Sequence, residues 1–170
     1  MTIDNSLDTR SATISAESGT AAAPEPPSLA DLQDRAAIND LISRLGVYLD
    51  EHRFDELRSL FVEDASVHTQ GGLATGRDAV VAQATRNHGE YEHLQHTIAN
   101  VLIDLAGDRA EARANMVAGL VREGLRPEVV FGGVYTFGLL RTAGGWRFAR
   151  LAARQVWRNE EPAAPRPAAS

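Results

Sequence analysis

The sequence contains no cysteine. Disulfides, thiolate zinc sites, iron–sulfur clusters and cysteine nucleophiles are therefore excluded. No apolar run approaches the ~18 residues that a membrane-spanning helix needs, and residues 1–19 are polar and lack the apolar stretch of a secretory signal. These features predict a protein without a membrane partner, and the cytoplasm is the expected location.

The sequence also has no excess of basic residues over acidic ones. The chain of 170 residues has 17 basic and 23 acidic residues, which gives a net charge of −6. Binding to nucleic acid relies on clustered basic charge, so no nucleic-acid partner is expected. The hydrophobic content of 44% is ordinary for a globular protein and excludes a collagen-like or wholly disordered chain.

The two ends of the chain differ in composition from its middle. Residues 1–27 are rich in Ser, Thr, Ala, Pro and Glu, and residues 159–170 read NEEPAAPRPAAS. Neither segment has enough apolar surface to offset the entropy of ordering, so both are predicted to be disordered tails. One folded domain is predicted over residues 28–158, which is long enough for a single core.

Three helices are predicted in the first half of this domain. Ser28 and Asp31 resemble a capping box. Apolar residues then recur at steps of three and four, which predicts a helix to about Glu51 with one buried face; its inward residues are Ile38, Leu41, Ile42, Leu45 and Leu49. A short helix is predicted over 54–61, a short strand over 66–70, and a third helix over 78–86 after a glycine-rich loop.

In the second half of the domain the apolar period changes to two. This period predicts strands over 96–105, 110–121, 129–141 and 146–157, joined by glycine-containing turns. Helices followed by antiparallel strands predict an α+β fold in which one curved sheet wraps on helices.

Several motifs in this order resemble a known family. They are DRAAI at 34–38, YLD at 48–50, FDEL at 54–57, LF at 60–61, EDA at 63–65, GRDAV at 76–80, GVYT at 133–136 and GGWRF at 144–148. Over about residues 31–158 the chain resembles the SnoaL-like branch of the nuclear transport factor 2-like superfamily. The resemblance implies a cone-shaped α+β barrel, with three N-terminal helices packed on a strongly curved, mainly antiparallel sheet.

The resemblance also implies a catalytic pair. In scytalone dehydratase and hexachlorocyclohexane dehydrochlorinase, an Asp near the end of the first helix pairs with a His on the strand after the third helix. The matching residues here are Asp50 and His96, and Tyr135 is placed toward the pocket. The dehydratase's second pocket histidine falls at 118–120, where this chain has none, and the dehydrochlorinase's arginine falls at Leu151. These departures argue against the same two reactions.

The residues themselves leave the role of this pair open. A histidine exchanges a proton near neutral pH and a carboxylate fixes its tautomer, but Asp50 can also cap its helix and His96 can be a partly buried strand residue. His68, His93 and His96 could suggest a metal. Residues three apart on a strand point to opposite faces, however, so neither a metal nor a cofactor is expected. His88 is predicted to be solvated.

Alternation along the last two strands predicts the wall of a pocket. One strand presents Phe131, Tyr135 and Phe137 on one face, which is either plain sheet core or the lining of an apolar pocket. On the last strand one face carries Leu151, Ala153, Gln155 and Trp157. A polar Gln155 on a mostly apolar wall is typical of a site that orients a small apolar or aromatic substrate.

The favoured function is a cofactor-independent enzyme in which His96, oriented by Asp50, moves a proton. The reaction would be elimination of water, isomerisation or aldol-type cyclisation, on a polyketide-like or steroid-like substrate. The alternatives are a non-catalytic ligand-binding or protein-interaction domain and a small-subunit partner of a dioxygenase. A homodimer or homotrimer is expected, because the outer sheet face would carry Val130, Val134 and Phe148.

Overall fold

The computed structural model describes residues 26–160, with helices first and long strands after them. The helices are α1 (Leu29–Asp50), the 3₁₀ helix η1 (Phe54–Leu60) and α2 (Arg77–His88). The strands are β1 (Phe61–Thr69), β2 (Gly72–Thr75), β3 (His93–Ala106), β4 (Arg109–Val121), β5 (Val129–Thr142) and β6 (Gly145–Glu160). The predicted tails lie mostly outside the described residues: residues 26–27 are described and belong to no helix or strand, and β6 continues two residues past the predicted domain end at 158.

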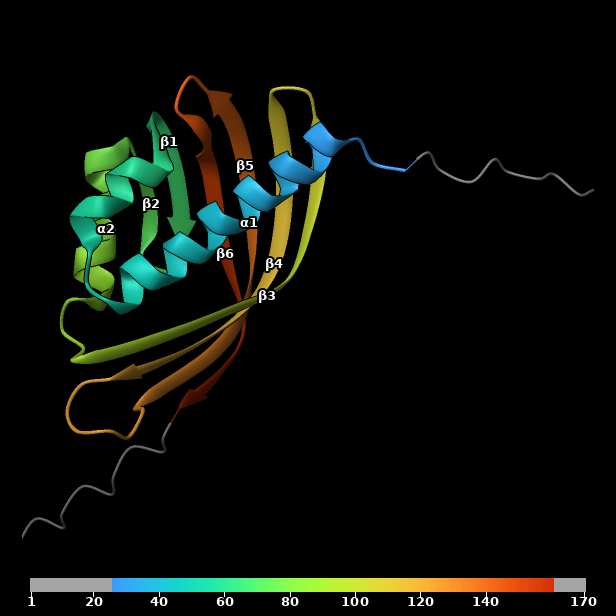
Figure 1. The fold of residues 1–170 in the computed structure, drawn as a ribbon. Helices are drawn as coiled ribbons and strands as arrows, with labels where there is room; N and C mark the ends of the chain where they lie inside the picture. Colours follow the sequence, from blue (N-terminus) through green and yellow to red (C-terminus); the bar gives the residue numbers. More distant parts are fainter. Residues whose placement is uncertain (1–25, 161–170) are drawn as a thin grey trace, which may run out of the picture.

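All six strands form one sheet, in the order β2-β1-β6-β5-β4-β3. Every neighbouring pair is antiparallel except β1 and β6, which run parallel. The long strands bend about halfway along their length, and α1 lies across the sheet (Figure 1). The fold is thus the predicted cone-like α+β arrangement of three helices on a curved, mainly antiparallel sheet.

Helix α1 forms for the reasons visible in its sequence. The Ser28 hydroxyl accepts a hydrogen bond from the Asp31 backbone N–H at 3.1 Å, and the Asp31 carboxylate accepts one from the Ser28 backbone N–H at 3.0 Å. This reciprocal capping box satisfies donors that the first helical turn leaves unpaired. All five residues predicted to face inward are buried in the core, so the predicted helix is confirmed.

The start of α1 is also tied to the far end of the sheet. Arg141 on β5 donates to both carboxylate oxygens of Asp34, at 2.7 and 2.6 Å, and the buried Trp146 ring on β6 donates to Asp34 at 3.0 Å. Chiefly through the hydrogen bonds from Arg141, these contacts lower the pKa of Asp34 to about 2. The charge on Asp34 therefore persists over the whole range in which proteins normally work.

The region between α1 and α2 was predicted only in part. The second helix is a 3₁₀ turn that ends at Leu60, and Phe61 already begins β1, five residues before the predicted strand. The predicted glycine-rich loop contains β2, which pairs with β1 in a tight hairpin. A strand of four residues is too short for its alternation to be recognised in the sequence.

Extra residues interrupt the pairing of two long strands. On β3 the register shifts between Ala99 and Leu102, around Asn100, whose φ is 54°. On β6 one extra residue lies between Phe148 and Arg150, and another between Gln155 and Trp157. Such β-bulges bend a strand and reverse which face the following side chains occupy. They explain both the curvature of the sheet and the failures of simple alternation described below.

The first bulge of β6 corrects the prediction for Phe148. Strict alternation placed this ring on the outer face with Arg150, but Phe148 pairs with Leu139 and is fully buried. Its ring stacks on Phe137 with centroids 5.1 Å apart and lies 5.3 Å from the ring of Phe61. Phe148 is therefore part of the core and not of an interface.

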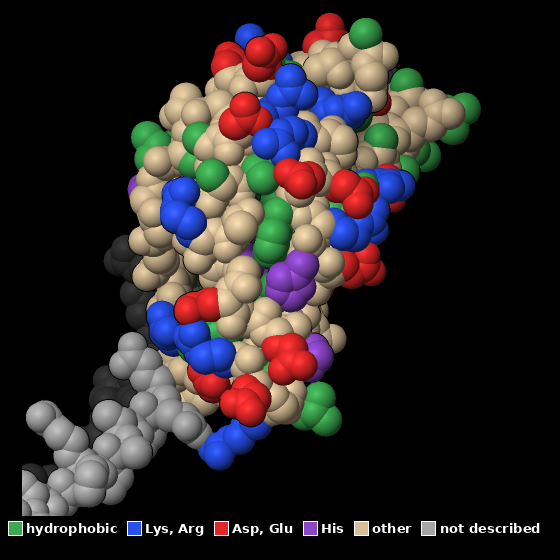
Figure 2. Space-filling model, turned by 90° about the vertical axis from the view of Figure 1, so that its left-hand side faces the viewer, with side chains coloured by type: hydrophobic (Ala, Val, Ile, Leu, Met, Phe, Trp, Pro, Cys, Tyr) green, Lys and Arg blue, Asp and Glu red, His purple; other side chains and the backbone are tan. Residues whose placement is uncertain are grey.

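The side of the molecule near α2 and η1 carries interspersed acidic and basic side chains (Figure 2). Arg58 donates to Asp55 at 2.6 Å and to Asp78 at 2.9 Å, which joins η1 to the start of α2. Exposed pairs of this kind contribute little to stability. No helix within residues 26–160 combines the length and apolar character required to cross a membrane.

Replacing Phe148 by Ala is expected to lower the free energy of unfolding by about 3–5 kcal/mol, because a large ring leaves a cavity in a packed core. The control is Leu102→Ala, whose side chain is 64% exposed and for which a change within about 0.5 kcal/mol is expected. Urea unfolding measures both. Similar small losses for the two variants would place Phe148 on the outer face after all.

Candidate active site

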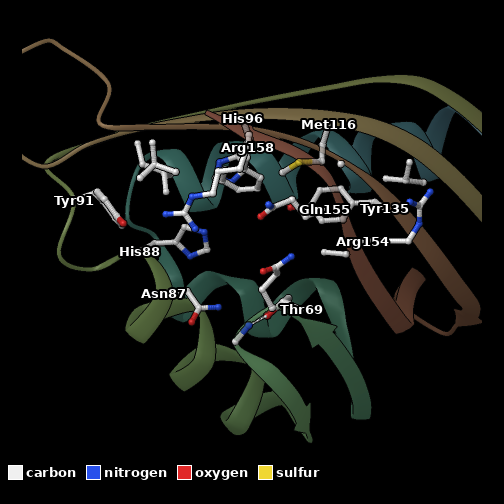
Figure 3. Close-up of a pocket in the computed structure, with 18 residues that line it drawn as sticks. Thr69, Asn87, His88, Tyr91, His96, Met116, Tyr135, Arg154, Gln155 and Arg158 are labelled. Atoms are coloured by element: carbon white, nitrogen blue, oxygen red, sulfur yellow. Dashed lines mark hydrogen bonds between the residues drawn. The ribbon is translucent and has the colours of Figure 1, made fainter. Parts of the chain in front are cut away.

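A cavity of about 340 Å³ lies between the concave face of the sheet and α2. Its walls come from β1, α2 and β3 to β6, and they combine apolar side chains with several polar ones, which Figure 3 shows. The apolar part includes Met116, Leu120 and Phe131, and the polar part includes Asn87 and Gln155. A concave apolar site with a few convergent polar groups is the usual form of a small-molecule site.

The end of α1 brings Asp50 against β3 at His96. The Asp50 carboxylate accepts two hydrogen bonds from the His96 backbone N–H, at 3.0 and 2.9 Å, and lies 2.6 Å from the ring Nδ1. An ionised carboxylate can only accept, so Nδ1 carries the hydrogen in this contact. The carboxylate therefore sets both the tautomer and the orientation of the ring.

The second ring nitrogen of His96 faces the cavity. The His96 side chain is only 1% exposed, and no hydrogen bond joins its Nε2 to another described residue. Because no fully buried side-chain nitrogen or oxygen among these residues lacks a hydrogen-bond partner, Nε2 is not fully buried. The open space that it reaches is the cavity that His96 lines. A lone pair on this nitrogen can accept a proton from a bound molecule.

His88 is a pocket residue that the sequence analysis missed. It was predicted to be solvated, but α2 runs two residues further than predicted, and His88 lies 5.5 Å from the His96 ring, edge to face. The spacing Val81, Ala84, His88 continues the apolar face of the helix and could have indicated this placement.

The environment of His88 keeps its ring neutral. Burial lowers the pKa of His88 to about 4, and the nearby His96 acts in the same direction. Nδ1 lies 2.9 Å from the backbone carbonyl of Ala84, a contact in which it donates. Nε2 is then an acceptor that lines the cavity, so His88 offers a hydrogen-bond acceptor and no positive charge at neutral pH.

Tyr135 supplies a hydroxyl to the same cavity. Tyr135 is buried, and no hydrogen bond links its hydroxyl to another described residue. Burial and the nearby Asp50 carboxylate raise the pKa of Tyr135 well above its usual range. The hydroxyl therefore stays protonated and can donate to an oxygen of a bound molecule.

The other predicted wall residues divide between the cavity and other places. Phe131 and Gln155 line the cavity with Tyr135. Phe137 and Leu151 are buried in the core, and Leu151 reaches only a smaller space of about 60 Å³ that adjoins the main cavity.

Trp157 lies on the opposite face of the sheet from the one predicted. The extra residue Val156 shifts the register, so that Trp157 pairs with Gly132 on the outer face and is 47% exposed. The same shift turns Arg158 inward, where it pairs with Phe131 and lines the cavity. Simple alternation could not have found Arg158.

The histidines considered as metal ligands do not converge. His93 is half exposed and points away from His96, and His68 lies exposed on β1. No group of three or more His, Asp or Glu side chains among the described residues is arranged to hold a metal ion.

A family model for the SnoaL-like domain matches residues 30–152. The chain belongs to the SnoaL-like family. An uncharacterized protein of Mycobacterium tuberculosis (strain H37Rv) is 29% identical to this SnoaL-like protein over 126 residues, which are 72% of this chain and 86% of that one.

Solved structures share the fold. A candidate scytalone dehydratase from Novosphingobium aromaticivorans is 26% identical, with a TM-score of 0.70 and coverage of 78% of this chain and 91% of that one. A type 2 hexachlorocyclohexane dehydrochlorinase is 24% identical, with a TM-score of 0.68 and coverage of 78% and 92%. At that identity the second likeness shows the fold alone.

The neutral state of His88 predicts a pH-dependent stability. Its pKa is about 4 in the folded protein against 6.5 for the free side chain. The unfolded chain therefore binds more protons between these values, and stability is lost as the pH falls from 6.5 to 4. We expect a loss of up to about 3 kcal/mol from this group, at 1.36 kcal/mol per pKa unit.

The loss is measured as the difference between wild type and His88→Gln in urea unfolding across this pH range. The exposed His68→Gln variant is the control and is expected to follow wild type. Parallel curves for wild type and His88→Gln would show that the ring is solvated.

Proposed function

We propose that this SnoaL-like protein is a cofactor-independent enzyme of the dehydratase, isomerase or cyclase type, in which His96 transfers a proton and Asp50 orients it. One observation carries the proposal: Asp50 holds both the backbone and Nδ1 of His96, while Nε2 opens onto the cavity. A base within reach of a bound molecule, held by a third group, is the arrangement that general acid–base catalysis requires.

The elimination of water illustrates the chemistry. Nε2 of His96 accepts a proton from the carbon next to a carbonyl, and the Asp50 carboxylate stabilises the resulting imidazolium. The electron pair of the broken C–H bond forms a C=C bond as the hydroxyl group leaves. The imidazolium returns its proton to that hydroxyl, which departs as water, and His96 is neutral again.

Two further groups can bind the reacting oxygens. The Tyr135 hydroxyl can donate a hydrogen bond to the carbonyl oxygen, on which negative charge develops during proton removal. Nε2 of His88 can accept a hydrogen bond from a substrate hydroxyl. Isomerisation and aldol-type cyclisation begin with the same proton removal, so the same groups serve them.

The cavity limits the substrate to a small, largely apolar molecule. Its volume of about 340 Å³ is at the lower end of the ~300–1,000 Å³ common for small-molecule sites. Phe131 and Tyr135 present aromatic walls suited to a ring. A polyketide-like or steroid-like ring system is the proposed class, and Gln155 is proposed to orient it.

The comparisons support an enzyme of this kind. The family match and the likeness to a candidate scytalone dehydratase favour a dehydratase-type reaction that proceeds without a cofactor. The substrate and the roles of Asp50 and His96 are part of the proposal.

Activity is tested on a panel of cyclic β-hydroxyketones, by the ultraviolet absorbance of the conjugated enone formed. His96→Ala is expected to lower turnover ~10²–10⁴-fold, the usual share of general acid–base catalysis. Asp50→Asn is expected to slow turnover as well, because an amide can hold the wrong tautomer.

The matched control is His93→Ala, a change on the same strand to an exposed ring that faces away from the cavity. Its rate is expected to equal that of wild type. Turnover by His96→Ala at the wild-type rate would end the proposal, and tight binding without turnover across the panel would favour the non-catalytic alternative.

We also propose that the protein is a homodimer or homotrimer that assembles through the outer sheet face. This face exposes Val117 and Trp157 at 43% and 47%, beside the partly buried Val130 and Val134. Light scattering at micromolar concentration is expected to give a multiple of 18.3 kDa, and Val117→Glu is expected to reduce it. A monomeric wild-type mass would contradict this assembly.

The cytoplasmic location expected from the sequence stays a prediction.

A further inference from the structure

The cavity differs in charge from the rest of the molecule. The chain carries a net charge of −6, yet no Asp or Glu is among the described residues that line the cavity. Asp50 lies behind the His96 ring, and His88 is neutral. The permanently charged groups in the wall are therefore cationic, and both belong to β6: Arg154 and Arg158.

Only Arg158 presents its side chain to the cavity. Arg154 pairs with Val134, a residue of the outer face. In Figure 3 the Arg154 side chain lies at the edge of the view, whereas that of Arg158 extends over the pocket. The two arginines thus differ in the face they occupy, although they lie four residues apart on one strand.

A β-bulge is responsible for this placement. If Val156 took a regular place in the ladder opposite Gly132, Trp157 would pair with Phe131 and face the cavity, and Arg158 would face outward. The indole of Trp157 lies so close to Gly132 that a Cβ atom at this position would collide with the ring. The space left by glycine therefore holds Trp157 on the outer face, and this contact keeps the bulge and Arg158 in place.

The Arg158 guanidinium has no protein partner within residues 26–159. Arg141 and Arg150 on the same sheet, and Arg122 just after β4, form ion pairs with carboxylates. No ion pair or hydrogen bond links the Arg158 side chain to another of the described residues. An unpaired guanidinium beside an apolar cavity suits a carboxylate, which it can bind through two parallel hydrogen bonds.

We propose that Arg158 binds a carboxylate of the substrate, so that the ligand is a small ring-bearing carboxylic acid. This inference rests on the proposed function for the reaction itself and adds the charge and the orientation of the substrate. The two histidine Nε2 atoms accept hydrogen bonds and do not bind an anion. The carboxylate therefore lies at Arg158, and the hydroxyl or acidic C–H of the ring points toward His88 and His96.

Binding of two matched probes tests this assignment. The probes are 2-naphthoate and its neutral isostere 2-naphthamide, with affinities for the full-length protein measured by calorimetry. Wild type is expected to prefer the carboxylate. Arg158→Gln is expected to weaken 2-naphthoate binding about tenfold, the lower range for a charge-assisted hydrogen bond at a partly exposed group, and to leave 2-naphthamide unchanged.

Arg154→Gln is the matched control, because it removes the same charge from the same strand on the other face. Its affinities are expected to equal those of wild type. The proposal is overturned if wild type binds the two probes equally or binds neither. It is also overturned if Arg158→Gln keeps the preference or Arg154→Gln loses it to the same extent.

The outcome is separable from that of the proposed function, since binding of the probes needs no turnover. His96→Gln is expected to keep the preference for 2-naphthoate. If the protein prefers 2-naphthoate but turns over no substrate, the carboxylate site at Arg158 is supported and the proposed activity is contradicted. If turnover depends on His96 but the protein shows no preference for 2-naphthoate, only the carboxylate site is contradicted.

Discussion

The carboxylate of Asp50 is the contact on which the geometry of the cavity depends. It ends α1 and receives both the backbone N–H and the ring Nδ1 of His96, so one side chain fixes the helix on β3 and aims the imidazole. A negative charge at a helix C-terminus is unfavourable, because it lies at the negative end of the helix dipole. Helix α1 has no basic residue in its last turn to offset this repulsion. The hydrogen bonds from β3 supply that compensation, and positive charge that develops on the ring adds to it.

Much of this architecture could be predicted from the sequence, because it depends on local patterns. The capping box at Ser28, the apolar face of α1 and the period-two strands after residue 93 are properties of short segments, and the structure confirms them. The contact between Asp50 and His96 spans 46 residues. No local pattern predicts it, and it was anticipated only through the family resemblance.

The remaining features could not be predicted because they depend on register. Phe148 and Trp157 occupy the faces opposite to those expected, since each β6 bulge reverses the alternation at one point. The extension of α2 to His88 has a similar effect: two additional helical residues turn a ring from solvent to the cavity. Whether a strand accommodates an extra residue is decided by its neighbours, for example by the space that Gly132 leaves for the Trp157 indole.

The bulge at Val156 decides which of two neighbouring side chains reaches the cavity. If Val156 instead paired with Gly132, the regular ladder would place the Trp157 indole at the mouth of the cavity in place of the Arg158 guanidinium, with no substitution at either position. A conventional substitution matrix would not register such a change. The charge at the mouth of the cavity is therefore set by the register of the last strand as well as by the identity of its residues.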